Sequence, residues 1–437
     1  MSQYQPGPLK KLFHFSRRQA AKYWFRLMQP YTIAITGSQG KTNTSYILSK
    51  LLPQALITDT NLDTIYNVPI TALKLKQHKQ LAIFEMGIDR PHEMDMHLTI
   101  VRPNISLITG IAPVHADKEH LGSIENIVSE KRKMIEILAA DDYAVLNYDD
   151  PLVRSMAKYT KAKILFYGSD PDHCQIYTDA DLKSHENYSI TAKGMQFNIY
   201  DQGEKMEIAT KLLGLHQISN IMGCYLVFKL INEVYLHNTQ NIREDFIVKI
   251  RDIKALQGRM SLEQGPQGLL ILDDSLRANI TSTKSGLMTF SQMSQLPGKK
   301  VVILGEMGEI GIMEKRIHKE LGKLISELPG IDHYIGIGPL QKLTQEEAFH
   351  NGLGENKFYW AKDVVVAVGI LRMLVGPKDT IYLKGSLLRH LERITMLLDG
   401  KDVGCSVTSC PLYNHCSKCK YLQTGYPMKL SPEPADN

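Results

Sequence analysis

The chain has 437 residues, of which 43% are hydrophobic and 22% charged, as expected for a globular protein of two or three domains. The net charge is only +5, and the basic residues cluster little beyond the first 26 positions, which argues against nucleic-acid binding. No apolar run reaches about 18 residues and the start does not resemble a secretory leader, so we expect a cytoplasmic protein without a membrane-spanning segment.

The N-terminal stretch KKLFHFSRRQAAKYWFRLM, residues 10–28, is basic and partly amphipathic. This pattern favours a helix that packs on its own domain, and peripheral contact with anionic lipid is the alternative. We therefore expect a basic helical extension over residues 1–30.

Apolar runs and segments of helical spacing alternate from residue 31 onward, which predicts a mostly parallel sheet. The expected strands are Tyr31–Thr36, Leu81–Met86, Ile105–Ile111, Tyr143–Asn147 and Ile164–Tyr167, and the expected helices are Asn43–Leu52 and Ile124–Leu138. Alternation of period two from Ile176 to Thr210 predicts an antiparallel edge, followed by a helix over Gln217–Asn232.

Gly258–Gly268 is rich in glycine and contains proline, so we expect a domain boundary close to it. Strand–helix alternation then resumes, which indicates a smaller Rossmann-like α/β domain. The expected strands are Leu269–Asp273, Val301–Gly305, His333–Gly338, Lys357–Trp360 and Thr380–Lys384, with helices over Glu314–Glu327 and Val364–Leu374. The predicted domains are 31–262, a P-loop central domain with an antiparallel edge; 263–400, the Rossmann-like domain; and 401–437, a Cys-rich tail.

A phosphate loop is predicted where the first strand ends in TGSQGKT, residues 36–42. Gly37 and Gly40 allow backbone amides to turn toward a phosphate, Lys41 supplies a positive charge, and the Thr42 hydroxyl suits Mg²⁺. Ile35 stands where the usual P-loop has its first glycine, so this is the shorter TGxxGKT form. The ATP-binding residues predicted here are Gly37, Ser38, Gln39, Gly40, Lys41 and Thr42. A P-loop alone does not separate ligases, kinases and switch proteins.

Candidate metal ligands follow two later strands. Glu85 ends LAIFEMG, where a carboxylate beside the phosphate loop suits Mg²⁺. His115 follows the strand that begins at Ile105, His120 precedes LGS with Ser123 as a helix cap, and the next helix carries Lys131.

TGSQGKT, EMG and a histidine before LGSIENIVSEK resemble the Mur ligases and their relatives the folylpolyglutamate synthetases. The resemblance implies that Thr42 binds one Mg²⁺, and that Glu85 and His115 bind a second together with Lys131 carbamylated by CO₂. His115 is preferred as the ligand because it comes directly after the strand, and His120 is the alternative.

Further segments extend the resemblance to residues 31–397. LLGLHQISN implies that Asn220 binds adenine with His216 nearby, and the linker Gly-Arg implies that Arg259 reaches the γ-phosphate. ILDDSLRANITS resembles the DDSYNANP segment of the D-alanyl-D-alanine-adding type, which implies that Asp274 binds ribose and that Asn279 supports its loop. Leu276 and Arg277 depart from that segment. LGEMGEIG, His318 and LKGS fit the same type, and Lys384 would meet the acyl phosphate or a substrate carboxylate.

The resemblance implies an ATP- and Mg²⁺-dependent ligase that joins a carboxylate to an amine through an acyl phosphate, with Lys41, Lys131, Arg259 and Lys384 as the catalytic residues. The substrates would be small molecules of a UDP-linked or lipid-linked muropeptide type in cell-wall synthesis. Because the phosphate loop begins near residue 36, no N-terminal UDP-sugar domain is expected. A folylpolyglutamate or other γ-glutamyl ligase is the second possibility, and a P-loop ATPase or switch protein that drives a partner is the third.

Four of the six cysteines, Cys405, Cys410, Cys416 and Cys419, lie in the tail with the spacing Cys-x4-Cys-x5-Cys-x2-Cys. Without a secretory leader a metal site is favoured over disulfides, with structural Zn²⁺ first, an iron–sulfur cluster second and reduced thiols third. Cys174 and Cys224 stand alone and are expected to be inert.

Overall fold

The computed structural model describes residues 8–59, 64–112, 121–181, 186–307, 313–412 and 415–427. The chain divides into two units, Met1–Lys254 and Ala255–Asn437. This division precedes the boundary predicted at residue 262, and the Cys-rich tail belongs to the second unit.

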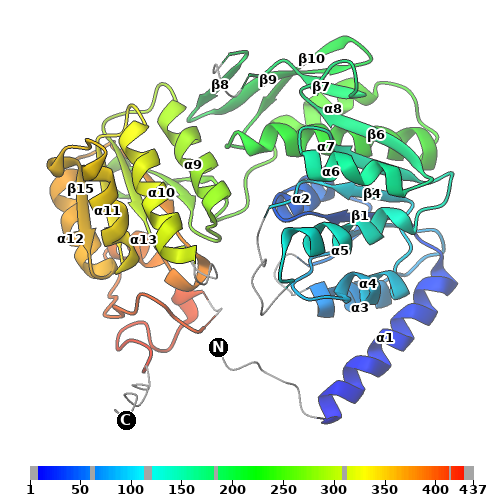
Figure 1. Cartoon of the computed structure of the whole chain (residues 1–437), viewed down its shortest axis with the longest axis horizontal. Coiled ribbons are helices and arrows are strands. Elements are labelled where there is room, and N and C mark those ends of the chain that lie inside the picture. The colour runs from blue at the N-terminus through cyan, green and yellow to red at the C-terminus, as the bar shows by residue number, and fades with distance from the viewer. Residues whose placement is uncertain are drawn as a thin grey trace. The chain divides into compact units, whose positions relative to one another are not determined.

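The first unit is built on one sheet with the strand order β10-β9-β7-β6-β5-β4-β1-β3-β2, and β8 pairs with β9 (Figure 1). The strands are β1 (Tyr31–Thr36), β2 (Leu56–Ile57), β3 (Leu81–Glu85), β4 (Ile105–Ile108), β5 (Tyr143–Asn147), β6 (Lys163–Gly168), β7 (Ile176–Thr178), β8 (Tyr188–Thr191), β9 (Gly194–Asp201) and β10 (Glu204–Thr210). Pairing is parallel from β2 to β7 and antiparallel from β7 to β10. This confirms the predicted parallel sheet with an antiparallel edge.

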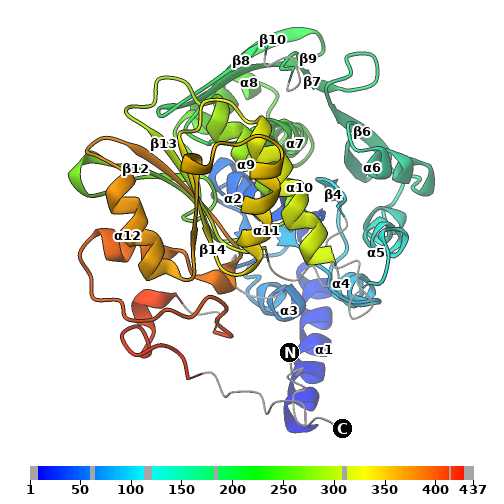
Figure 2. The ribbon, with the colours of Figure 1, turned by 60° about the vertical axis from the view of Figure 1, so that its left-hand side comes forward.

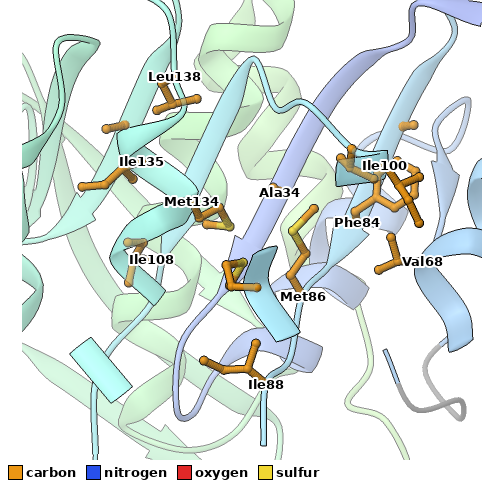
Figure 3. Packing of buried hydrophobic residues seen from close by; sticks show 14 of the residues in the cluster. Ala34, Val68, Phe84, Met86, Ile88, Ile100, Ile108, Met134, Ile135 and Leu138 are labelled. Atoms are coloured by element: carbon orange, nitrogen blue, oxygen red, sulfur yellow. The ribbon is translucent and has the colours of Figure 1, made fainter. Parts of the chain in front are cut away.

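Helices cover both faces of this sheet. They are α1 (Pro8–Met28), α2 (Lys41–Leu51), α3 (Thr64–Leu73), α4 (Glu93–Ile100), α5 (Ile124–Glu136), α6 (Pro151–Met156), α7 (His216–Leu230) and α8 (Ile242–Arg251), with the short η1 (Ala157–Tyr159) and η2 (Ile231–Tyr235). On one face, Ala34, Phe84 and Ile108 pack against residues of α3, α4 and α5 (Figure 3). On the other face α2 packs against α7. Strands covered on both faces need continuous apolar runs, which is why the sequence pattern located them.

Helix α1 packs on the first unit through one side only. Ala21 and Phe25 are buried, and the Trp24 ring N–H donates to the Leu75 carbonyl over 2.9 Å. The predicted packed helix is therefore confirmed, and Figure 2 shows it as a long blue helix beside α3 and α4, against which it packs. None of the described helices combines the length and apolar character that crossing a bilayer requires.

The second unit has its own sheet, of which Figure 2 labels β12, β13 and β14. Its strand order is β11-β12-β16-β13-β14-β15. Its strands are β11 (Ser261–Gln264), β12 (Leu270–Asp274), β13 (Lys300–Leu304), β14 (His333–Ile337), β15 (Phe358–Ala361) and β16 (Thr380–Lys384). Its helices are α9 (Ile280–Gln292), α10 (Glu314–Glu327), α11 (Leu340–His350), α12 (Val364–Leu374) and α13 (Glu392–Leu398), with the short η3 (Pro266–Gly268), η5 (Glu355–Lys357), η6 (Leu387–Arg389) and η7 (Cys416–Lys418). The pairings from β12 to β15 are parallel, as predicted.

The segment Gly258–Gly268 differs from the predicted boundary. It lies inside the second unit and contains β11, which pairs antiparallel with β12. The glycines and Pro266 mark the turns on either side of this short strand, because Gly258 and Gly268 have φ angles of 73° and 79°. The turn residues therefore led to the prediction of a linker where the structure has a short edge strand.

Candidate active site

The loop between β1 and α2 is shaped so that only glycine fits at two positions. Gly37 and Gly40 have φ angles of 153° and 84°. A Cβ atom on Gly37 would lie 2.1 Å from Thr109 Oγ1, and one on Gly40 would lie 2.7 Å from Asn220 Oδ1. The Ser38 amide donates to the Gly110 carbonyl over 2.7 Å, which ties the loop to the chain after β4. The loop thus forms the tight backbone cradle that a phosphate needs.

Two lysine amines meet at this loop. Lys41 Nζ donates to the Gly37 carbonyl oxygen over 2.6 Å, and Lys131 Nζ reaches the same oxygen over 3.1 Å from α5. The Lys131 side chain is buried, with 3% of its surface exposed. Burial, together with the neighbouring Lys41 cation, lowers the pKa of Lys131 well below its usual range. Both causes favour the uncharged amine over the ammonium, and the uncharged amine is the form that reacts with CO₂.

The predicted oxygen ligands also come together. Thr42 Oγ1 donates to Glu85 Oε1 over 3.0 Å, although the two residues are 43 positions apart. Glu85 ends β3 beside β1, and its amide donates to Thr58 Oγ1. A hydroxyl and a carboxylate at the edge of a phosphate loop are hard oxygen donors, which suit Mg²⁺.

The two candidate histidine ligands, His115 and His120, lie outside the described residues. The flanking elements are described. Strand β4 ends at Ile108, earlier than predicted, and α5 begins after Ser123, whose side chain accepts from the Asn126 amide as the predicted cap. The choice between His115 and His120 stays a prediction.

Several residues that support the loop were missed from the sequence. Thr109 Oγ1 lies 3.2 Å from the Thr36 carbonyl and 2.5 Å from the Gln39 carbonyl, and the Asn147 amide donates to the Thr109 carbonyl. His97 Nε2 lies 3.0 Å from the Gly87 carbonyl, just after Glu85, and burial lowers its pKa to about 4. The sequence could have indicated these residues only by their positions: Thr109 follows β4, Asn147 ends β5, and His97 lies on α4.

Asn220, predicted at the adenine, lies on α7 and is buried. Its amide nitrogen donates to Gln217 Oε1 over 3.0 Å, which directs the other amide atom, Oδ1, toward Gly40. Asn220 therefore adjoins the phosphate loop, and its contact with adenine stays a prediction.

In the second unit, two residues that were predicted in separate roles form an ion pair. Asp274 and Lys384 are paired neighbours on β12 and β16, with Lys384 Nζ 2.7 Å from Asp274 Oδ2. The Tyr382 hydroxyl donates to the same carboxylate oxygen, and Lys384 Nζ also donates to the Arg277 carbonyl. The pair lies at the carboxyl ends of parallel strands, where α/β sheets bind ligands.

The remaining predicted residues of the second unit have structural contacts. The Asn279 side chain and Ser282 form a capping box at the start of α9. Arg259 follows Gly258, whose carbonyl accepts from the Leu276 amide. His318 is buried on α10, with Nδ1 2.8 Å from the Glu314 carbonyl.

The comparisons with known proteins agree with this geometry. The family description "Mur ligase middle domain" matches residues 35–228, and "Mur ligase, glutamate ligase domain" matches residues 258–387. The chain is 24% identical over 382 residues to the UDP-N-acetylmuramoyl-tripeptide–D-alanyl-D-alanine ligase of Escherichia coli K12, covering 86% of this chain and 78% of that protein. It is 27% identical over 383 residues to the Bacillus subtilis 168 ligase of the same name, with the same coverage.

Solved structures show the same fold. The MurF structure from Acinetobacter baumannii superposes with a TM-score of 0.75 at 23% identity, over 89% of this chain and 81% of that one. MurF from Thermotoga maritima in complex with ADP superposes with a TM-score of 0.73 at 21% identity, over 89% and 84%. The phosphate loop, the buried lysine, the two α/β units and these matches together place the chain in the Mur ligase family, as an ATP-dependent amide-forming ligase.

Proposed function

We propose that the chain joins the carboxylate of a muropeptide-like precursor to an amine through an acyl-phosphate intermediate. The observation that carries this proposal is the buried Lys131 amine on the Gly37 carbonyl, next to the Thr42–Glu85 pair. A simple ATPase or switch protein needs no such uncharged amine beside its phosphate loop. A ligase that binds a second Mg²⁺ through a carbamate does.

The first step would transfer the γ-phosphoryl group of ATP. A carboxylate oxygen of the substrate attacks the γ-phosphorus, and the bond to the ADP oxygen breaks. In this step the loop amides and Lys41 would hold the phosphates, and Thr42, Glu85 and carbamylated Lys131 would be the oxygen ligands of Mg²⁺. Mg²⁺ held there would supply positive charge to the phosphoryl oxygens.

The second step would form the amide. The amine attacks the acyl carbon, inorganic phosphate leaves, and the amine loses a proton. Lys384 is positioned by Asp274, whose carboxylate also accepts from Tyr382, and by the family resemblance it would meet a substrate carboxylate or the acyl phosphate. Arg259, Asn220 and Asp274 would contribute to nucleotide binding, as the family resemblance implies.

The substrate class is tested by phosphate release. We expect the enzyme to be nearly idle with ATP alone and to release phosphate when a UDP-linked or lipid-linked muropeptide and D-alanyl-D-alanine are both present. Turnover with dihydrofolate and glutamate instead would establish the folylpolyglutamate alternative. Steady ATP hydrolysis that neither substrate class stimulates would contradict a ligase.

We also propose that α1 contacts an anionic lipid surface. Five large apolar side chains of this helix are exposed: Leu12, Phe13, Phe15, Tyr23 and Leu27, by 50–71%. Lys22 and Arg26 lie on the same helix, and a basic amphipathic helix of this kind suits the interface of an anionic bilayer. Lipid-linked precursors would be found at the same surface.

Vesicle sedimentation tests this contact. We expect the protein to bind vesicles that contain phosphatidylglycerol, to bind pure phosphatidylcholine vesicles several-fold less, and to lose binding as salt increases. The Phe13→Asp variant should lose most of the binding, while Met373→Asp, at an exposed position in the second unit, should keep it. Equal binding to both lipids, or a dimer in solution that Phe13→Asp dissociates, would contradict the proposal.

A cytoplasmic location, where ATP and Mg²⁺ are supplied, belongs to the same proposal. A structural Zn²⁺ in the tail is a separate proposal, and its support is the burial of Cys405, Cys410 and Cys416.

A further inference from the structure

The four tail cysteines line one small cavity, although they are spread over fifteen residues of sequence from Cys405 to Cys419. Cys405, Cys410 and Cys416 are only 7–8% exposed, and all four are free thiols. The cavity is completed by Arg393 and by apolar and aromatic side chains, including Leu422 and Tyr426. Four thiols that line a common space, three of them buried, are the ligand set of a soft metal centre.

The backbone on either side of these thiols is held in place. The Cys405 amide donates to the Leu422 carbonyl over 2.9 Å, which joins the two ends of the tail segment. The Cys410 amide donates to the Leu388 carbonyl over 2.9 Å, and the Cys419 amide donates to the Cys416 carbonyl over 3.0 Å. Backbone hydrogen bonds therefore attach Cys410 to η6, Cys405 to Leu422 and Cys419 to Cys416, which limits the movement of the chain that carries the proposed ligands.

A buried cation adjoins the cavity. Arg393 is 1% exposed, and its Nη1 lies 2.7 Å from the Cys405 carbonyl and 3.3 Å from Cys405 Sγ. Its other nitrogens donate to the carbonyls of Arg389, His390 and Val407. Among the described side chains, no carboxylate forms an ion pair with this guanidinium. A buried charge without a counter-charge is costly, and neutral thiols do not supply one.

We propose that Cys405, Cys410, Cys416 and Cys419 bind a thiophilic metal centre, Zn²⁺ or an iron–sulfur cluster, as four thiolates, with Arg393 as the counter-charge. Four thiolates on a divalent ion leave a net charge of about −2, which the Arg393 cation partly balances. The N–H group that points at Cys405 Sγ stabilises the thiolate further. This inference concerns the tail alone and does not rest on the proposed ligase function.

A second ligand set is close by. Ligand atoms of His390, Glu392 and Cys416 lie within 4.8 Å of one another. However, His390 Nδ1 lies 2.9 Å from Glu392 Oε1, and His390 Nε2 lies 2.8 Å from the Leu412 carbonyl. The same Glu392 oxygen accepts from the Cys416 amide over 3.2 Å. Because both ring nitrogens of His390 are engaged, we base the proposal on the four thiols that line the cavity and not on this mixed set.

The proposed centre would stabilise the chain next to the LKGS segment. Arg389, in η6, lies 3.4 Å from the buried Glu306 carboxylate and 3.5 Å from the Thr408 carbonyl of the tail. Metal binding by the tail would therefore hold η6, which follows Ser386, in position.

The test is elemental analysis of the full-length protein purified without oxygen, together with its visible absorption. We expect a stoichiometric metal in one of two forms. These are about one zinc per chain without visible colour, or iron with matching acid-labile sulfide and a broad visible band. Cys405→Ser, Cys410→Ser, Cys416→Ser and Cys419→Ser should each lose most of the metal, and chelation should lower the melting temperature of the wild type.

Two variants serve as controls. Cys174→Ser removes a buried thiol of the first unit, and Glu392→Gln keeps an acceptor for the Cys416 amide; both should retain the metal. A wild-type protein without zinc or iron overturns the proposal, and this measurement requires no variant to fold. Loss of the metal from Glu392→Gln, with retention in Cys410→Ser, assigns it to the His390 set and overturns the four-thiolate centre. Phosphate release measured in parallel keeps this result separate from the ligase activity.

Discussion

The Lys131→Ala enzyme is expected to form ADP at least about a thousandfold more slowly than the wild type when both substrates are saturating, which corresponds to about 4 kcal/mol of lost transition-state stabilisation. The physical reason is that an alanine carries no carbamate, so the second Mg²⁺ would lose an oxygen ligand. The side chain is buried against the phosphate loop, with Nζ 3.1 Å from the Gly37 carbonyl, so bulk water is a poor replacement.

The dependence on CO₂ distinguishes a carbamate from a simple amine. Wild-type activity should fall in CO₂-depleted buffer and recover with bicarbonate, while Lys131→Ala should not respond to bicarbonate. Acetate, which is smaller than the removed part of the side chain and supplies carboxylate oxygens, should partly restore Lys131→Ala. Lys131→Arg should stay inactive because its guanidinium remains charged and does not react with CO₂. Wild-type turnover in CO₂-free buffer that equals turnover with bicarbonate would refute the carbamate.

The lowered pKa of Lys131 also gives the sign of a stability effect in CO₂-free buffer. The amine is protonated in the unfolded chain below its ordinary pKa, but in the folded chain it takes up a proton only at a lower pH. This difference destabilises the fold increasingly as pH falls below the unfolded value, and the cost vanishes above it. Lys131→Met should therefore not unfold more readily than the wild type at neutral pH, so its inactivity would report chemistry and not misfolding.

The Lys41→Ala variant should lower the rate of ADP formation by about three orders of magnitude, because a fixed cation at the β/γ-phosphates stabilises the charge of the phosphoryl transfer. Lys41 begins α2, and its amine lies 2.6 Å from the Gly37 carbonyl, directly over the loop. The rate is measured as ADP formed with ATP and both substrates at saturation.

The matched control is Lys50→Ala, which removes a lysine from the last turn of the same helix, where Lys50 is exposed over the Tyr46 ring. This variant should keep wild-type turnover. A Lys41→Ala enzyme that forms ADP at the wild-type rate would show that the loop lysine takes no part in the chemistry.

The sequence alone located the helices and strands whose formation depends on a pattern of neighbouring residues. β1, β5 and β16 have the predicted bounds, as do α10 and α12, because buried parallel strands and amphipathic helices have short periodicities that a single segment displays. The phosphate loop was equally evident, since its glycines and lysine are adjacent in the chain.

Only the tertiary structure decided which residues from distant parts of the chain lie together. Lys131 and Gly37 are 94 positions apart, and Asp274 and Lys384 are 110 apart. Family resemblance assigned Asp274 and Lys384 to different ligands, and the parallel register of β12 with β16 is what places them together. Likewise, no pattern in the tail indicates that Arg393 is buried beside Cys405. Local propensity arises from neighbours along the chain, whereas the burial and charge that set the chemistry of a side chain come from whichever segments pack against it.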